Sequence, residues 1–242
     1  MTSPTLQANE RALKASRLFA RADESFVASL AQTSVRKSLA RGDFLWRAGA
    51  PATHFAIIAS GLMKISRHSA DGTDAIVAIF GPRESIGDVA VVRRAAYPAN
   101  AIAASSAVAI ILVDAAPVLS AMQSNTGIAE AINTSLLEHM QALQEKIKIM
   151  TAGAVPRRLA TLLLHLVERF GDELDDGSTF IPVVLSRIEL SRLIGTTVET
   201  TIRAMSRWQK QGWIETTQDG FKLGSVDPLT RLTSRAEAEL HE

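Results

Sequence analysis

The sequence predicts an α+β fold of three parts in chain order: an antiparallel β-sandwich or barrel, a long helix, and a winged helix-turn-helix. Three observations support this prediction. Short strand-like runs separated by turn residues fill residues 35–113, an apolar heptad pattern covers residues 127–150, and two capped helices followed by a hairpin fill residues 186–223. The expected limits of the three parts are residues 15–125, 126–152 and 153–226.

The composition is that of a soluble globular protein, and it fits a reducing cytoplasm. The chain has 242 residues, of which 47% are hydrophobic and 21% charged, and its net charge is +1. It contains no cysteine, which excludes disulfides, thiolate zinc sites and cysteine-held iron–sulfur clusters. No apolar run reaches membrane-spanning length, and the N-terminus lacks a signal-peptide pattern. We therefore expect a cytoplasmic protein without a membrane partner.

The N-terminal part begins with helix-like and irregular sequence and then becomes strand-like. Residues 1–12 are polar and are expected to be loose, and residues 24–32 predict a short helix. From Val35 onward, short apolar runs alternate with turn residues, which is typical of an antiparallel sandwich or barrel. The turns include Arg41-Gly42-Asp43, Gly49-Ala50-Pro51 and Asp71-Gly72.

The long helix carries an apolar seam. Its members recur at gaps of 4, 3, 4 and 3 residues, which is the heptad pattern of a coiled coil, and Asn133 on the same seam could fix its register. An amphipathic helix packed on its own domain has the same period, so the period alone does not decide between the two. The seam residues are Leu136, Met140, Leu143, Ile147 and Met150.

A stretch of small residues ends the long helix and marks the expected domain boundary. Residues 151–154 form the break, and Pro156 suits the first turn of a new helix over residues 157–170. A solvated acidic loop over residues 171–178 and a short strand over residues 180–184 follow.

Two capped helices form the next unit. Ser186 and Glu189 have the spacing of a capping box, and Gly195 can take the left-handed turn after a short helix. Thr196-Thr197 offers a second N-cap to a helix that runs toward Gln211. Helix, tight turn and second helix together predict a helix-turn-helix, which places its second helix in the DNA major groove.

The second helix has two different faces. The stripe that can pack on a core consists of Thr201, Ala204, Met205 and Trp208. On the other face, Arg203 can donate twice to guanine, Glu199 can accept from cytosine, and Ile202 can meet a thymine methyl. The alternative is an exposed Glu199–Arg203 ion pair on an ordinary surface helix, which leaves the exposed Ile202 harder to explain.

A predicted hairpin with an Asp219-Gly220 turn follows directly, as in a winged helix. The charges of the helix-turn-helix are mainly positive, which suits phosphate contacts. They are Arg187, Arg192, Arg203, Arg207 and Lys210, against Glu189 and Glu199.

The segment Glu199-Thr200-Thr201-Ile202-Arg203 resembles the recognition-helix core of the CRP/FNR family of bacterial transcription regulators. Upstream, Arg41-Gly42-Asp43, residues 60–65 (SGLMKI) and Gly87-Asp88 resemble that family's cyclic-nucleotide-binding β-roll, in order and spacing. The resemblance implies a homodimer joined along the long helix, which binds double-stranded DNA and contacts RNA polymerase. A signal at the β-roll would control it.

The resemblance also implies site residues. Base contacts would come from Val198, Glu199, Ile202 and Arg203, and backbone contacts from Arg187, Thr200 and Ser206. Arg203 and Glu199 would read a G·C pair in a TGA-like half-site. Val198 stands where cyclic-AMP-type members carry Arg, which resembles the oxygen- and nitric-oxide-responsive branch.

An effector pocket would be formed by Gly87, Asp88, Tyr97, Pro98, Asn100 and Leu143. Cyclic AMP is disfavoured, because no Arg occurs from Ala95 to Pro156 to pair its phosphate, although Arg93 or Arg94 could be recruited. Leu143 also replaces the hydroxyl residue of nucleotide-binding members. Haem remains possible, with His54, His68, His139 and His165 as candidates without ligand-like spacing, and so does the absence of any ligand.

The sequence shows no nucleophile elbow, phosphate-cradling loop or metal-ligand spacing, so it predicts neither an enzyme nor a metal site. The alternative function is a cyclic-nucleotide- or haem-binding sensor module whose helix-turn-helix serves protein contacts.

Overall fold

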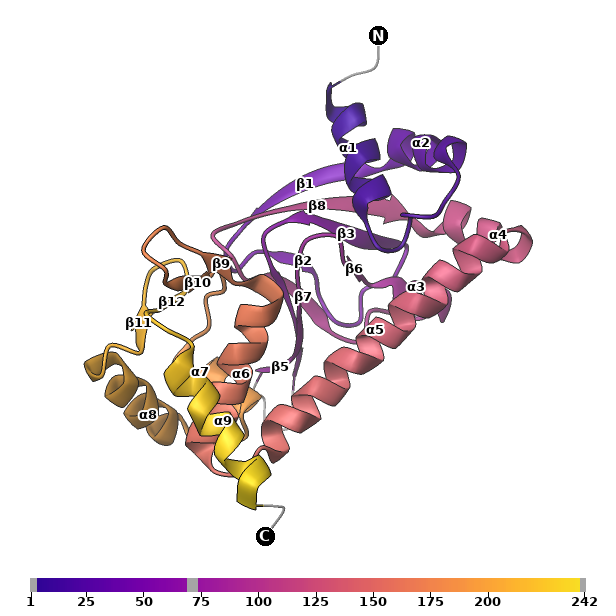
Figure 1. Ribbon diagram of the computed structural model, residues 1–242. Helices are drawn as coiled ribbons and strands as arrows, with labels where there is room; N and C mark the ends of the chain where they lie inside the picture. The colour runs from indigo at the N-terminus through magenta and orange to yellow at the C-terminus, as the bar shows by residue number, and fades with distance from the viewer. Residues whose placement is uncertain (1–3, 69–73, 240–242) are drawn as a thin grey trace. The chain divides into compact units, whose positions relative to one another are not determined.

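The computed structural model describes residues 4–68 and 74–239 and shows two compact units (Figure 1). The first comprises Met1–Asp74 and Ala78–Ala142, and the second comprises Ala75–Val77 and Leu143–Glu242. The predicted Asp71-Gly72 turn lies outside the described residues. In the described ranges, no helix is both long and apolar enough to cross a membrane.

Two four-stranded sheets, with strand orders β1-β8-β3-β6 and β2-β7-β4-β5, form the first unit except for Ala75–Val77 of β5. The pairs β1–β8, β8–β3 and β3–β6 are antiparallel, as are β2–β7 and β7–β4. This agrees with the antiparallel sandwich or barrel that the sequence predicts. The strands are β1 (Val35–Ala40), β2 (Phe44–Trp46), β3 (His54–Ser60), β4 (Met63–His68), β5 (Asp74–Phe80), β6 (Ser85–Ile86), β7 (Asn100–Ala103) and β8 (Ala107–Asp114).

Strand β3 is buried on both faces because its alternate side chains enter two different cores. Phe55 and Ile57 join a core with residues of the helices α1 and α2. Ala56 and Ile58 join the core that holds Met63 of the second sheet. Figure 1 shows α1 and α2 beside β1 and β8. The helices of this unit are α1 (Pro4–Ala15), α2 (Glu24–Thr33), α3 (Asp88–Val92) and α4 (Ala115–Ser124).

The expectation that residues 1–12 are loose is wrong for the described part, since α1 begins at Pro4. Leu13 is fully buried in the core, and Asn9 donates from Nδ2 to the Ser34 carbonyl at 3.2 Å. The polar side chains that suggested a loose segment lie on the remaining faces of this helix. Packing against α2 and the sheet thus stabilises a helix of which half the residues are polar.

The predicted long helix is α5 (Thr126–Thr151), close to the expected residues 127–150. Ile128 and Ile132 are buried in the core of the first unit, while the boundary between the compact units falls inside the helix, after Ala142. A break in the helix follows as predicted, and Gly153 in this break has a φ of +89°.

The second unit combines helices with a small sheet of order β11-β12-β10-β9. Its helix α9 packs against α6 and lies wholly beyond the predicted limit at residue 226. The strand expected over residues 180–184 is shorter, because β10 ends at Ile181. The elements are α6 (Val155–Phe170), β9 (Asp172–Glu173), β10 (Thr179–Ile181), α7 (Arg187–Leu193), α8 (Val198–Lys210), β11 (Ile214–Thr216), β12 (Phe221–Leu223) and α9 (Asp227–Glu239).

Candidate nucleic-acid interface

Side-chain caps set the start of both helices of the helix-turn-helix. At α7, Ser186 Oγ accepts from the Glu189 amide at 3.2 Å, and Glu189 Oε2 accepts from the Ser186 amide at 2.8 Å. This reciprocal pair is the predicted capping box. At α8, Thr197 Oγ1 accepts from the Thr200 amide at 3.2 Å. Between the helices, Gly195 has a φ of +63°, a conformation that favours glycine.

The inner face of α8 holds the helix in place. Thr201, Met205 and Trp208 are buried, as the predicted stripe requires, and Ala204 is half-buried. Thr201 donates from its hydroxyl to the Thr197 carbonyl at 3.1 Å, so its polar atom is satisfied inside. The Trp208 and Trp213 rings lie 6.0 Å apart between centroids. The burial of these residues therefore determines which face of α8 points away from the core.

The outer face of α8 carries the predicted base-contacting residues. Glu199, Arg203 and Ser206 are exposed, and Ile202 is 45% exposed although it is an isoleucine. Val198 and Thr200 are half-buried at the start of the helix. The outer face of α8 therefore places one apolar side chain, Ile202, between the charged side chains of Glu199 and Arg203.

Three of the predicted DNA-contacting residues, Arg187, Thr200 and Arg203, already have hydrogen-bond partners within the unit. Arg203 donates from Nη2 to Thr200 Oγ1 at 3.3 Å. Arg187 donates from Nη2 to Thr216 Oγ1 at 2.8 Å, which ties α7 to the hairpin. Partial burial lowers the pKa of Arg187. The roles of these residues toward DNA stay predictions.

The predicted hairpin is present, but its turn differs from the expected Asp-Gly type. Strands β11 and β12 pair antiparallel, with Thr216 opposite Phe221. Thr217 Oγ1 accepts from the Gly220 amide at 3.0 Å and from the Asp219 amide at 3.3 Å. Gly220 is needed for space and not for a positive φ, because a Cβ there would clash with the Ile181 carbonyl oxygen.

The heptad seam of α5 is largely exposed. Met140, Leu143, Ile147 and Met150 are exposed, with Ile147 at 62%. Leu136 is instead partly buried against the core of the first unit, and its neighbour Leu137 is 55% exposed. The outward apolar stripe thus contains Leu137, which the heptad spacing did not single out.

All of the predicted effector residues except Leu143 belong to the first unit, and Tyr97 lies beside Gly87. A Cβ at Gly87, whose φ is +87°, would lie 2.8 Å from Trp46 Cη2 and 3.2 Å from Tyr97 Cε1. The Trp46 and Tyr97 rings are stacked, with 4.1 Å between centroids. Asn100 Oδ1 accepts from the Ala48 amide at 2.8 Å, and Pro98 is exposed. Leu143 belongs to the second compact unit, so its place in such a pocket stays a prediction.

The polar groups of this corner are largely bonded to protein atoms. Tyr97 donates from its hydroxyl to the His54 carbonyl, and burial raises the pKa of Tyr97. Asp88 is fully buried, and its Oδ2 accepts from the hydroxyls of Ser85 and Ser135. Asp88 Oδ1 lies 3.7 Å from His139 Nε2, and it has no hydrogen-bond partner among the described residues.

The candidate haem ligands whose side chains are described each lie beside a different polar neighbour. His54 Nδ1 lies 2.9 Å from Thr53 Oγ1, His139 Nε2 lies 3.2 Å from the Ser85 carbonyl, and His165 Nδ1 lies 3.8 Å from Glu145 Oε2. His68 ends β4, and its side chain lies outside the described set. Within residues 4–68 and 74–239, no group of three or more metal-ligating side chains is present.

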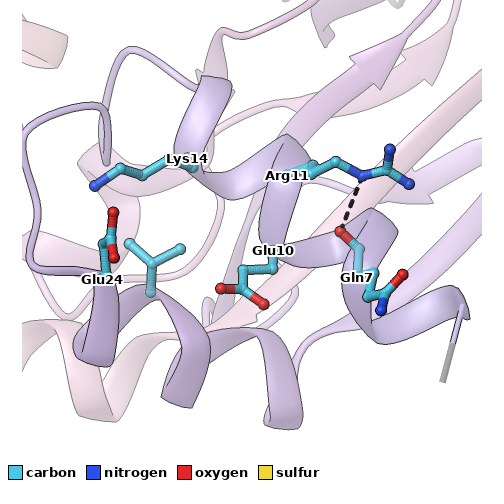
Figure 2. Close-up of a pocket in the computed structure, with 6 residues that line it drawn as sticks. Gln7, Glu10, Arg11, Lys14 and Glu24 are labelled. Atoms are coloured by element: carbon cyan, nitrogen blue, oxygen red, sulfur yellow. Dashed lines mark hydrogen bonds between the residues drawn. The ribbon is translucent and has the colours of Figure 1, made fainter. Parts of the chain in front are cut away.

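A pocket that the sequence did not predict lies between α1 and α2, with a volume of about 480 Å³ (Figure 2). Lys14 and Glu24 point into it from opposite helices, and Lys14 donates to the Ala22 carbonyl at 2.8 Å. Both positively and negatively charged side chains line the pocket. The lining residues are Gln7, Glu10, Arg11, Lys14, Glu24 and Val27.

Comparison with known proteins follows the same division of the chain. The family model of the cyclic nucleotide-binding domain matches residues 36–125, and that of the Crp-like helix-turn-helix domain matches residues 157–232. A CRP-like cAMP-activated global transcriptional regulator of Mycobacterium tuberculosis is 24% identical over 88% of this chain and 95% of its own length. A probable transcriptional activator of Rhizobium leguminosarum is 26% identical over 83% of this chain and 82% of its own length.

Solved structures have the same fold. A CRP-family transcriptional regulator from Thermus thermophilus aligns with a TM-score of 0.69 and 18% identity, covering 81% of this chain and 96% of its own. FixK2 from Bradyrhizobium japonicum aligns with a TM-score of 0.68 and 18% identity, covering 83% of this chain and 98% of its own. With its cyclic nucleotide-binding domain, its long helix and its Crp-like helix-turn-helix domain, the chain belongs to the CRP/FNR family of transcription regulators.

Proposed function

We propose that this regulator binds an inverted-repeat DNA operator as a homodimer and reads each half-site with the outer face of α8. The observation that carries the proposal is the division of that helix. Thr201, Met205 and Trp208 anchor one face, while Glu199 and Arg203 flank an exposed Ile202 on the other. The exposed face thus combines donor, acceptor and apolar groups.

Each group suits a different feature of a base pair in the major groove. Arg203 has two donors for guanine O6 and N7, Glu199 can accept from the amino group of cytosine, and Ile202 can contact a thymine methyl. The hydrogen bond from Arg203 to Thr200 keeps the guanidinium on this face before DNA binds. Val198 presents no hydrogen-bonding group at the first position of the helix, so the outer bases of the half-site should differ from those read by an Arg there.

Phosphate contacts would set the register of this reading. The side chains proposed for this are Arg187, Thr200 and Ser206. Arg187 is held by Thr216 of the hairpin, so a phosphate at this point would meet α7 and the wing together.

The exposed stripe of α5 supports the homodimer. Leu137, Met140, Leu143, Ile147 and Met150 leave apolar side chains in water along one helix, and a second copy of the same helix would cover them. A symmetric dimer carries two recognition helices, which suits half-sites about one helical turn apart, roughly 34–36 Å. DNA binding of this type would act in the cytoplasm and, by family resemblance, in contact with RNA polymerase.

The proposal includes an effector other than cyclic AMP, or none. The Mycobacterium relative is described as cAMP-activated, but here the Asp88 carboxylate accepts from Ser85 and Ser135 inside the unit. No Arg lies between Ala95 and Pro156 to pair a nucleotide phosphate. Micromolar binding of cyclic AMP in calorimetry would overturn this part. Absorption and mass spectra of the purified protein would detect haem or a retained nucleotide.

Selection of bound sequences from a random DNA pool, followed by fluorescence anisotropy, tests the base-reading role. Arg203→Ala should weaken operator binding by roughly 1–3 kcal/mol and relax specificity at one base pair. Arg207→Ala is the matched control, since Arg207 is also exposed, four residues further along α8. It should weaken operator and random DNA about equally. Equal losses on both DNAs for Arg203→Ala would refute base reading by that residue.

A further inference from the structure

Arg158, near the start of α6, donates hydrogen bonds to three backbone carbonyls. Its Nε reaches the Gly153 carbonyl at 2.7 Å, and its Nη1 reaches the carbonyls of Ile194 at 3.2 Å and Gly195 at 3.1 Å. Gly153 belongs to the break between α5 and α6, whereas Ile194 caps α7 and Gly195 forms the turn before α8. The guanidinium of Arg158 therefore links the non-helical segment between α5 and α6 to the helix-turn-helix.

The carbonyl acceptors explain why this position carries an arginine. The last carbonyls of a helix lack partners within the helix, and a cation near the C-terminus of α7 is favoured by the helix dipole. A guanidinium presents several N–H groups in a fixed plane, so it can serve separate carbonyls at once. A lysine ammonium in the same place would keep the charge but lose that planar geometry.

Packing at the turn supports the same connection. A Cβ on Gly195 would lie 3.4 Å from Met150 Cε and 3.6 Å from Arg158 Nη1. The last turn of α5, the side chain of Arg158 and the turn at Gly195 thus lie close together. Since α8 begins at Val198, three residues after Gly195, a shift of this turn would move the N-terminal end of α8.

We propose that Arg158 is a positioning residue for the DNA-reading face. Its hydrogen bonds fix the turn of the helix-turn-helix to the non-helical segment after α5. The direction of α8 then follows the conformation at Gly153, through a residue that itself touches no base. This inference rests on the proposed DNA binding of α8.

Arg157 supplies a matched control. It lies next to Arg158 and is also half-buried, but its Nε donates to the Leu232 carbonyl of α9 at 3.2 Å. Arg158→Ala and Arg157→Ala each remove one positive charge from the same turn of α6. Any general electrostatic effect on DNA binding should therefore be shared by the two variants.

Operator and random-DNA affinities of both variants, measured by anisotropy, give the first test. Arg158→Ala should weaken operator binding by roughly two- to thirtyfold more than it weakens random-DNA binding. Arg157→Ala should weaken both DNAs alike, and Arg158→Lys should fall between Arg158→Ala and the parent protein. Arg158→Lys also keeps the test decisive if Arg158→Ala does not fold. An operator loss in Arg158→Lys no larger than in Arg157→Ala would overturn the proposal.

Amide hydrogen exchange of the DNA-free protein gives the second test and does not depend on the proposed function. The Thr196 amide donates to the Ser191 carbonyl at 2.9 Å, and the Ile194 amide donates to the Leu190 carbonyl at 3.1 Å. Both should exchange faster in Arg158→Ala than in Arg157→Ala. Equal exchange in the two variants would overturn the positioning role. If the parent protein selected no DNA sequence, the proposed function would fail, while the exchange result would still decide whether Arg158 holds the turn.

Discussion

The outer face of α8 and the corner around Gly87 differ in how far their polar side chains are exposed to solvent. On α8, Glu199 and Arg203 are exposed beside Ile202. In the corner, the Tyr97 hydroxyl and the Asn100 carbonyl oxygen are bonded to backbone groups of the same unit. A polar group bonded inside the protein stabilises the fold, whereas one left outside is available to a partner. The outer face of α8 is thus exposed to solvent, as the proposed DNA binding requires, whereas these polar groups of Tyr97 and Asn100 are bonded within their own unit.

The largest expected effect concerns the apolar stripe of α5. Ile147→Asp, at its most exposed position, should abolish the dimer and operator binding, because an unpaired carboxylate buried in the interface costs roughly 3–5 kcal/mol. Leu143→Asp should act in the same way. Sedimentation measures the dimer. Gln141→Asp, an exposed position of α5 outside the stripe, is the control and should leave the dimer intact. A dimer that persisted in Ile147→Asp would exclude this stripe as the interface.

The two faces of α8 should separate stability from DNA binding. Met205→Ala removes a buried side chain and should lower the free energy of unfolding by about 2–5 kcal/mol. Ile202→Ala, on the exposed face, should change the free energy of unfolding by less than about 0.5 kcal/mol. It should nevertheless weaken operator binding. Denaturant unfolding and anisotropy measure the two effects, and a large stability loss in Ile202→Ala would show that this side chain supports the fold.

The close packing of Trp46 and Tyr97 around Gly87 predicts that a larger residue at position 87 lowers the stability of the protein. Gly87→Ala should destabilise the protein by about 1–3 kcal/mol, since it combines a positive φ with a clash against Trp46. Gly42→Ala is the control, because Gly42 has a φ of +88° but no atom lies within 4 Å of the position that an added Cβ would take. Thermal unfolding should therefore show a larger loss for Gly87→Ala. Equal losses would mean that the corner has room for a methyl group.

The smallest effect is spectroscopic and tests the same corner in the unmodified protein. Tyr97 is the only tyrosine in the chain, so alkaline difference absorbance reports it alone. Burial, the largest cause, raises its pKa, while the hydrogen bond to the His54 carbonyl lowers it. Tyr97 should ionise above the pH at which the denatured protein does. Its contribution to stability is present below the unfolded pKa of about 10 and is lost as the pH rises through the folded pKa. Ionisation at the same pH in both states would show an open corner.

Local sequence signals were sufficient for the helix-turn-helix. The capping box of Ser186 and Glu189, the cap at Thr197 and the buried stripe of α8 depend on residues only three or four positions apart, so short-range chemistry determines them. The long helix was predictable for the same reason, because its heptad spacing lies within one element.

Features that depend on distant contacts could not be predicted in this way. Helix α1 is half polar and is stabilised through Asn9 and Leu13, which contact residues further along the chain. The choice between Leu136 and Leu137 as the outward residue depends on the core against which Leu136 packs. The requirement for Gly220 arises from the Ile181 carbonyl on a neighbouring strand, and no property of the Asp-Gly pair indicates it.

By itself, the sequence determined the order of the parts, the capped helices and the residues on each face of α8, because these follow from periodicity and from bonds between near neighbours. The tertiary structure decided which polar groups remain available. Asp88 accepts from Ser135, which lies 47 residues away, and Arg158 donates to carbonyls 36 and 37 residues away. Such partners are brought together only by the packing of whole elements, so the spacing of residues along the chain does not predict them.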